Sequence, residues 1–427
     1  MSNSLGATAN FHKLLKQGIW LYFFLLLFEG ALRKWVLPGL ATPLLLIRDP
    51  VAILLIYFTW KKGLLSSNLY LSSFVFLGIL GIFTAVFFGH GNIYVAMYGA
   101  RILLLHLPLI FVIGRIFDHE DVLEMGKAIL WMAIPMVIII GIQFYSPQSA
   151  WINRGVGGDI EGGGFSGALG FYRPSGTFSF TNGNSLFFSL LASFIFYFWL
   201  EQGKLNKLLL IGASVALLSS IPLSISRTLL FFVVISLMFA VVASSRKREY
   251  FRKILIVSVG CLITLSALLQ TSYFGTATEA FASRYETANE TEGGLEGVVM
   301  DRFLGGLVGA LTGSAEVPFF GYGLGMGTNV GSMLLMGDTY YLISEGEWGR
   351  VIGELGQLFG LVIIFLRMGL TIKLTIASFK ELSRENLLPW MLMSFGVLNI
   401  SQGGWAQPTS LGFCVVIAGL VIASFNK

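Results

Sequence analysis

Four arginines are candidate anion-binding residues, because each lies in a polar loop or where an apolar segment begins. Arg173 lies in FYRPSGTFSFTNGNS, Arg227 in SSIPLSISRTLLFF, Arg302 in a long polar segment, and Arg350 at the start of another apolar stretch. An arginine binds phosphate through a planar fork of donors and does not lose its charge. Four converging arginines would suit a pyrophosphate. The structural alternatives are a capped helix start with a solvated Arg173 and snorkelling of Arg227 to the headgroups.

Two glutamates, Glu345 and Glu347, are candidate general bases shortly before Arg350. A carboxylate in reach of a hydroxyl group can accept its proton during catalysis. The same residues have a structural interpretation, because Ser344 and Glu347 have the spacing of a capping box. Glu347, Arg350 and Glu354 also share one helical face, which predicts an ion-pair ladder.

Asn182 and Asn184 follow Arg173 where the N-cap of a helix is expected. A helix N-terminus beside an arginine favours anions, so Asn182 is a further candidate for substrate binding.

Charged residues also occur inside apolar segments. Glu29 and Arg33 have i, i+4 spacing, and Arg48 adjoins Asp49. Ionisable groups at membrane depth are functional candidates by default, although these two pairs could simply neutralise each other.

The composition is that of a membrane protein. The chain of 427 residues is 55% hydrophobic and 12% charged, about half the charge of a soluble domain. The apolar runs are continuous, which favours helices over a β-barrel. The histidines are scattered and both cysteines lie in apolar runs, so we expect no metal site and no cofactor.

We therefore predict an all-α, polytopic bundle, with residues 1–427 forming a single integral membrane domain of about twelve spans. The predicted spans are 18–37, 43–60, 69–88, 93–116, 127–145, 185–200, 207–223, 228–245, 254–271, 350–372, 387–402 and 410–425.

The lysines predict the orientation. Lys61, the run from Arg246 to Lys253, Lys380 and Lys427 fall on one side, which the positive-inside rule makes cytoplasmic together with both termini. This orientation predicts two outer loops. One is 146–184, and the other is a large, mainly acidic loop at 272–350 that contains short helices.

Four short blocks together resemble the O-antigen ligase and O-antigen polymerase family of bacterial membrane proteins. They are Arg173 to Phe178 with Asn182, Ser226-Arg227, Phe320 to Gly325, and Glu354-Leu355-Gly356. Ligases of the family carry a His-Asn pair shortly before that last glutamate. Here Glu345-Gly346 occupies the position, which favours a polymerase-like member. The segments FEGALRKWVLP and IRDP are similar to the start of a polymerase-like subgroup.

The resemblance implies a glycosyltransferase of the bacterial inner membrane that acts in surface or exopolysaccharide biosynthesis. Donor and acceptor would both be glycans on undecaprenyl pyrophosphate, joined at the outer, periplasmic face by inverting transfer without a metal. Arg173, Arg227 and Arg302 would hold the pyrophosphate, and Glu345 or Glu347 would take the acceptor proton. Further partners would be chain-length regulators or export proteins, and no nucleic acid.

Three other functions remain open from the sequence, and one of them is a non-catalytic scaffold in a polysaccharide-export complex. A ligase would pass the glycan to lipid A core or to protein. A transporter or flippase would move lipid-linked sugars, although such proteins often carry internal repeats that are not apparent here.

Overall fold

The computed structural model describes residues 2–201, 203, 205–292, 306–312, 317–337, 343–344 and 346–426. The first half contains α1 (Ser2–Ala31), η1 (Leu32–Val36), η2 (Pro38–Leu40), α2 (Ala41–Leu44), α3 (Asp49–Lys61), α4 (Leu69–Phe87), α5 (Ile93–Arg101), η3 (Ile102–His106), α6 (Pro108–Ile116), α7 (His119–Tyr145), η4 (Trp151–Asn153), β1 (Phe165–Ser166), β2 (Tyr172–Arg173) and α8 (Thr181–Leu200). The second half contains α9 (Lys207–Leu223), α10 (Arg227–Ser244), α11 (Arg248–Leu269), α12 (Ser272–Glu292), α14 (Gly306–Thr312), α15 (Asn329–Met336), α16 (Glu347–Ser383), α17 (Leu388–Gln402) and α18 (Pro408–Ala423).

The prediction of a helical membrane protein is confirmed. Within the described ranges, nine helical stretches are long and apolar enough to cross a membrane. Three of the twelve predicted spans correspond instead to helices of 17, 15 and 16 residues, α9, α17 and α18. These fall short of the ~18–20 residues that a bilayer requires, so the predicted count is not confirmed.

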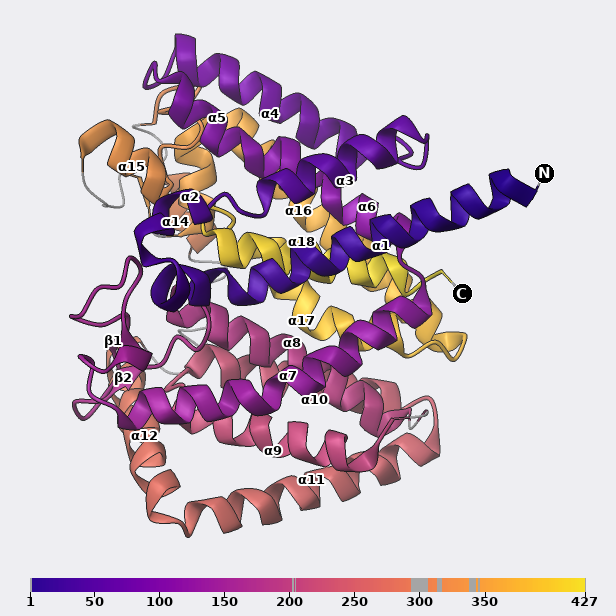
Figure 1. Cartoon of the computed structure of the whole chain (residues 1–427), viewed down its shortest axis with the longest axis vertical. Coiled ribbons are helices and arrows are strands. Elements are labelled where there is room, and N and C mark those ends of the chain that lie inside the picture. The colour runs from indigo at the N-terminus through magenta and orange to yellow at the C-terminus, as the bar shows by residue number, and fades with distance from the viewer. Residues whose placement is uncertain are drawn as a thin grey trace.

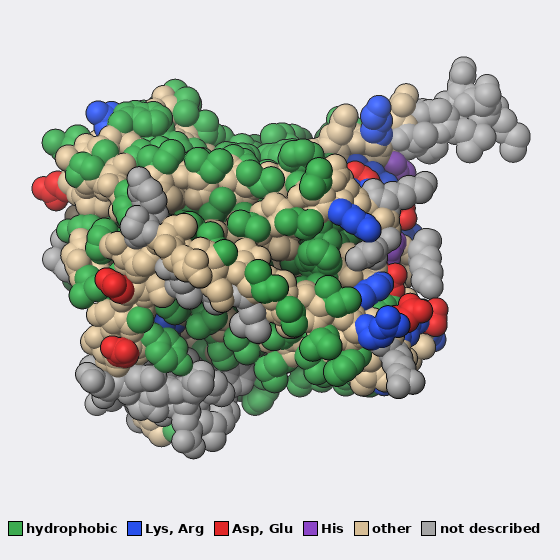
Figure 2. Space-filling model, turned by 90° about the horizontal axis from the view of Figure 1, so that it is seen from below, with side chains coloured by type: hydrophobic (Ala, Val, Ile, Leu, Met, Phe, Trp, Pro, Cys, Tyr) green, Lys and Arg blue, Asp and Glu red, His purple; other side chains and the backbone are tan. Residues whose placement is uncertain are grey.

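The long helices lie roughly alongside one another, and the bundle has two distinct ends. Both termini lie at one end, on the right in Figure 1, while β1, β2, α12, α14 and α15 lie at the other. Apolar side chains cover the middle of the face in Figure 2, and lysines and arginines gather toward the end that carries the termini. This distribution suits a bundle whose sides face lipid.

Helix α8 is at the centre of the bundle. In its apolar window 89% of the residues are buried, the largest share of any candidate span in the described part. Ser394 Oγ of α17 lies 3.0 Å from Ser193 Oγ of α8 and 2.9 Å from Ser236 Oγ of α10. Small side chains let the backbones approach, and the hydroxyl groups satisfy one another away from water.

Helix α16 reverses direction at Gly356. Glu347 and Arg367 would be about 30 Å apart along a straight helix, yet their side chains form an ion pair of 2.7 Å. The reversal occurs at Gly356, where φ is 76° and ψ is 173°. The predicted span 350–372 is therefore wrong as one straight helix, because 347–355 and 357–383 form a hairpin of two arms. Hydropathy could not reveal this, since the stretch 347–383 taken as a whole is long and apolar enough to pass as a single span.

Of the two predicted pairs of buried charges, the structure contains one. Glu29 and Arg33 form the predicted pair, with Arg33 Nη1 3.4 Å from Glu29 Oε1. The predicted pair of Arg48 with Asp49 is wrong, because Arg48 Nε lies 3.3 Å from Glu29 Oε2 and Asp49 Oδ2 lies 3.4 Å from Arg101 Nε. Successive residues point in different directions on a helical backbone, so neighbours in sequence rarely face each other.

Replacing Gly356 by alanine should destabilise the protein by at least about 1–3 kcal/mol, because this backbone conformation is essentially restricted to glycine. The added methyl carbon would also lie 1.9 Å from the carbonyl oxygen of Phe319. The measurement is the thermal unfolding midpoint of the purified protein in detergent. Gly369→Ala in the same helix is the control, since its methyl group would make only ordinary contacts with Tyr70. Equal midpoints for both variants would contradict the hairpin.

Candidate functional site

Arg173 is carried by a small β-hairpin in the loop that precedes α8. β1 and β2 pair antiparallel, with Phe165 opposite Arg173. A methyl group on Gly167, in the bend of this hairpin, would lie 3.5 Å from Arg173 Cγ and 2.6 Å from Ile225 Cδ1. The hairpin therefore brings the Arg173 side chain next to the segment that leads into α10.

Arg227 is the first residue of α10, and a serine fixes the start of this helix. Ser226 is the N-cap, and its hydroxyl oxygen accepts a hydrogen bond from the Leu229 amide at 3.2 Å. The same oxygen lies 2.8 Å from Ser185 Oγ of α8. The preceding residue, Ile225, is fully buried with φ of 45°, which a β-branched residue rarely adopts. Strain of this kind is common at functional sites.

Arg284 of α12 joins this group, although our sequence analysis did not select it. Its Nη1 donates to the carbonyl oxygen of Gly167 at 3.0 Å and to that of Ser166 at 3.4 Å. The available signal was an isolated arginine in the mainly acidic segment 272–350. Arg173, Arg227 and Arg284 are called the arginine cluster below.

The arginine cluster carries concentrated positive charge. Burial, and then the positive charges of Arg284 and Arg227, lower the pKa of Arg173 to about 10. Arg173 Nε is buried without a hydrogen-bond acceptor, and no carboxylate among the described residues forms an ion pair with Arg173. Arg173 is only half-buried, but a charged donor atom buried without an acceptor is costly, so this arrangement favours a bound anion.

Asn182 lies in the first turn of α8 and binds α18. Its Nδ2 donates to Ser410 Oγ at 2.8 Å and to Gln407 Oε1 at 3.2 Å. The predicted capping role of Asn182 and Asn184 is wrong, because Phe180 is the N-cap and no side chain caps it. The amide of Asn182 instead connects the helix start near the arginine cluster to the start of α18.

Glu347 and Arg350 belong to a separate, electrically balanced network within the α16 hairpin. Arg350 donates from Nε and Nη2 to Glu347 at 2.9 and 2.8 Å, and from Nη1 to Glu354 at 2.6 Å. This confirms the predicted ladder. Arg367 of the second arm donates to Glu347 Oε1 at 2.7 Å and stacks over the ring of Trp405, 3.6 Å from its centroid. Two arginines and two glutamates thus neutralise one another, and Arg350 retains no free face for a phosphate.

The predicted capping box at the start of α16 is wrong. Gly346 is the N-cap and makes no side-chain cap, and Glu347 is the first helical residue instead of the third. Ser344 Oγ accepts a hydrogen bond from the Gly346 amide at 3.1 Å. Glu345 and Arg302 lie outside the described residues, so their predicted roles stay predictions.

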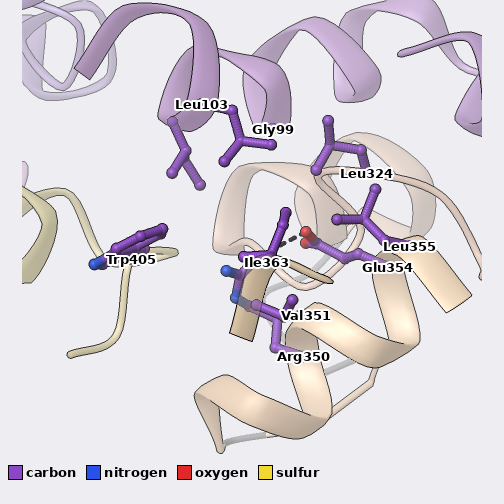
Figure 3. A pocket seen from close by; sticks show the side chains of 10 residues that line it. Gly99, Leu103, Leu324, Arg350, Val351, Glu354, Leu355, Ile363 and Trp405 are labelled. Atoms are coloured by element: carbon purple, nitrogen blue, oxygen red, sulfur yellow. Dashed lines mark hydrogen bonds and ion pairs between the residues drawn. The ribbon is translucent and has the colours of Figure 1, made fainter. Parts of the chain in front are cut away.

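A small cavity lies beside the balanced network, and Glu354 joins this network to the glycine-rich segment. Figure 3 shows the side chains of Arg350 and Glu354 facing it, with Trp405 on another side. The Glu354 carboxylate uses one oxygen for Arg350 and the other to accept the Gly327 amide at 2.9 Å. Gly356 lets the backbone of Phe319 approach. The Glu-x-Gly block thus fastens the glycine-rich segment 319–327 to α16. The cavity is lined by Gly99, Ile102, Leu103, Leu324, Arg350, Val351, Glu354, Leu355, Ile363 and Trp405.

The described residues include no group of three or more His, Cys, Asp or Glu side chains that could hold a metal ion.

No protein-family model matches the chain, and no curated protein matches it significantly. The assignment to a family therefore rests on the short blocks named above and remains an expectation.

Substituting Glu347 by glutamine should destabilise the protein by about 3–5 kcal/mol, since the change leaves two buried arginines sharing one glutamate. Glu381→Gln is the matched control, because Glu381 pairs with Arg384, whose side chain is 75% exposed, and an exposed pair contributes at most about 1 kcal/mol. Chemical unfolding in detergent measures both. A stable but inactive Glu347→Gln variant would instead indicate that Glu347 is the base.

Arg173→Gln should raise the unfolding midpoint in buffer free of phosphate anions. The substitution removes a half-buried charge that has like charges as neighbours, so the folded state gains stability although the site loses a donor. Arg384→Gln, at the opposite end of the bundle, should leave the midpoint nearly unchanged. A lower midpoint for Arg173→Gln would mean that Arg173 is a paired structural residue.

Proposed function

We propose that the protein is a polysaccharide polymerase of the bacterial inner membrane. It transfers a glycan from undecaprenyl pyrophosphate to a sugar hydroxyl of a second lipid-linked repeat unit. The bond between the anomeric carbon and the pyrophosphate oxygen breaks, and a bond from that carbon to the acceptor oxygen forms. The acceptor proton passes to a carboxylate, undecaprenyl pyrophosphate leaves, and direct displacement inverts the anomeric carbon.

The observation that carries this proposal is the arginine cluster. Arg173, Arg227 and Arg284 come from three separate segments. Arg173 and Arg284 contact the bend at Gly167, the charge of Arg227 acts on Arg173, and the buried Arg173 Nε lacks an acceptor. Planar donor forks suit the several oxygens of a pyrophosphate better than a single carboxylate. Fixed positive charge near the leaving group stabilises the negative charge that develops on it, without reorganisation during the reaction.

The proposed membrane arrangement follows from the two ends of the bundle. Both termini would be cytoplasmic, so the arginine cluster and the loops at the other end would face the periplasm (Figure 1). The shorter helices α9, α17 and α18 would complete twelve crossings with the nine long stretches. The polyprenyl tail would remain in lipid while the pyrophosphate reaches the outer end.

Glu345 is the preferred base in this proposal. Glu347 accepts hydrogen bonds from Arg350 and Arg367, so its carboxylate is occupied on both oxygens. Glu345 lies between Ser344 and Gly346, just before α16 begins. Glu347 would then contribute indirectly, by holding the two arms of the α16 hairpin together.

The test is polymerisation by purified protein in lipid vesicles supplied with lipid-linked repeat units from its own host. The wild type should form a ladder of lengthening products. Arg173→Ala and Arg227→Ala should slow it by about 10²–10³-fold, the usual cost of losing one donor to a developing charge. Glu345→Gln should slow it by about 10²–10⁴-fold. Arg384→Ala, at the opposite end, is the control.

Three other outcomes would overturn the proposal or part of it. Products attached to lipid A core or to protein, without a ladder, would identify a ligase. Movement of labelled lipid-linked sugar between leaflets, without bond formation, would identify a flippase. Full activity of Glu345→Gln would exclude Glu345 as the base while leaving the polymerase intact.

A further inference from the structure

The end of α1 and the turn η1 contact the segment that directly follows Arg173. Thr177 Oγ1 donates to the carbonyl oxygen of Leu27 at 2.7 Å. Lys34 Nζ donates to Ser175 Oγ and to the Gly176 carbonyl oxygen, both at 2.8 Å. The segment FEGALRKW, which the proposed chemistry does not use, thus lies against the loop of the arginine cluster.

A second set of contacts fixes the far end of the segment that follows Arg173. Arg33 Nη1 donates to Ser179 Oγ at 2.9 Å and pairs with Glu29. Glu29 also pairs with Arg48, whose Nη2 donates to the Pro408 carbonyl oxygen at 2.7 Å. The loop is therefore connected through three buried charges to the first turn of α18.

Gly30 is the point of closest approach between α1 and the loop. A methyl group there would lie 2.2 Å from the Phe178 carbonyl carbon and from the Ser179 nitrogen. Both are backbone atoms, which cannot rotate away as a side chain can. Any larger residue at position 30 must therefore displace the segment 177–179.

The Lys34 side chain is fully buried, and no carboxylate among the described residues pairs with it. Burying a lysine in this way is costly inside a membrane protein. Its two donor bonds hold the turn at Gly176, where φ is 60°. Gln143 Oε1 accepts the Gly176 amide at 2.8 Å from the other side.

We propose that Gly30 and Lys34 are positioning residues that fix the segment 175–179 and thereby aim Arg173 at the pyrophosphate. This inference rests on the proposed function. Arg173 is joined to Ser175 through Pro174, whose ring fixes φ and transmits a displacement along the backbone. The assigned role is indirect, and neither residue touches the substrate.

The first measurement is binding of inorganic pyrophosphate to the full-length protein in detergent, read from the unfolding midpoint across a titration. Lys34→Met and Gly30→Ala should weaken binding by at least about tenfold, because a misplacement of about 1 Å can cost far more than that. Lys34→Arg, which keeps the charge and donors, should recover most of the affinity. Gly18→Ala on the same helix is the control, since its methyl group would meet only the flexible side chain of Leu55.

The second measurement is amide hydrogen exchange of residues 175–179 in the same variants without ligand. Lys34→Met and Gly30→Ala should exchange faster there than Gly18→Ala. Unchanged exchange, or faster exchange with unchanged pyrophosphate affinity, would overturn the positioning role. A wild type that does not bind pyrophosphate would overturn the anion site, and with it both proposals. A wild type that binds, with variants that bind equally well, would overturn only this inference.

Discussion

A charge buried in a membrane protein must find its counter-charge within the protein, since lipid supplies neither water nor ions. The α16 hairpin meets this constraint fully: Glu347, Arg350, Glu354 and Arg367 cancel one another. Arg173 does not meet it within the described residues, because its Nε is buried without an acceptor and no described carboxylate pairs with it. The contrast separates a network that holds the fold together from an arginine that our proposal pairs with the pyrophosphate of the substrate.

The sequence was sufficient for the helical membrane class, and it singled out Arg173 and Arg227 as candidate site residues. Both signals are local, because apolar runs and arginines at their edges can be recognised without knowing what lies nearby. Arg284 was missed because its significance depends on the contact of α12 with the bend at Gly167. Pairings such as Glu29 with Arg48 were missed for the same reason, since they join separate helices.

The glycines illustrate the same limit. Gly30 and Gly356 look like ordinary residues of apolar helices, yet each permits a backbone contact that a methyl group would prevent. One brings α1 against the loop after Arg173, and the other turns α16 back on itself. Their importance comes from the partner backbone, which lies far away in the sequence, so hydropathy and periodicity could not identify them.

The α16 hairpin also constrains how the protein is made. The second arm, 357–383, is long and apolar enough to be inserted into a bilayer as it leaves the ribosome. The first arm brings three charged residues in nine positions, which makes insertion by itself unfavourable. We expect it to dock afterwards against Arg367, which pairs with Glu347 and stacks over Trp405. We therefore expect attachment of the glycine-rich segment to α16 to be a late step that depends on the C-terminal part of the chain, which supplies Trp405.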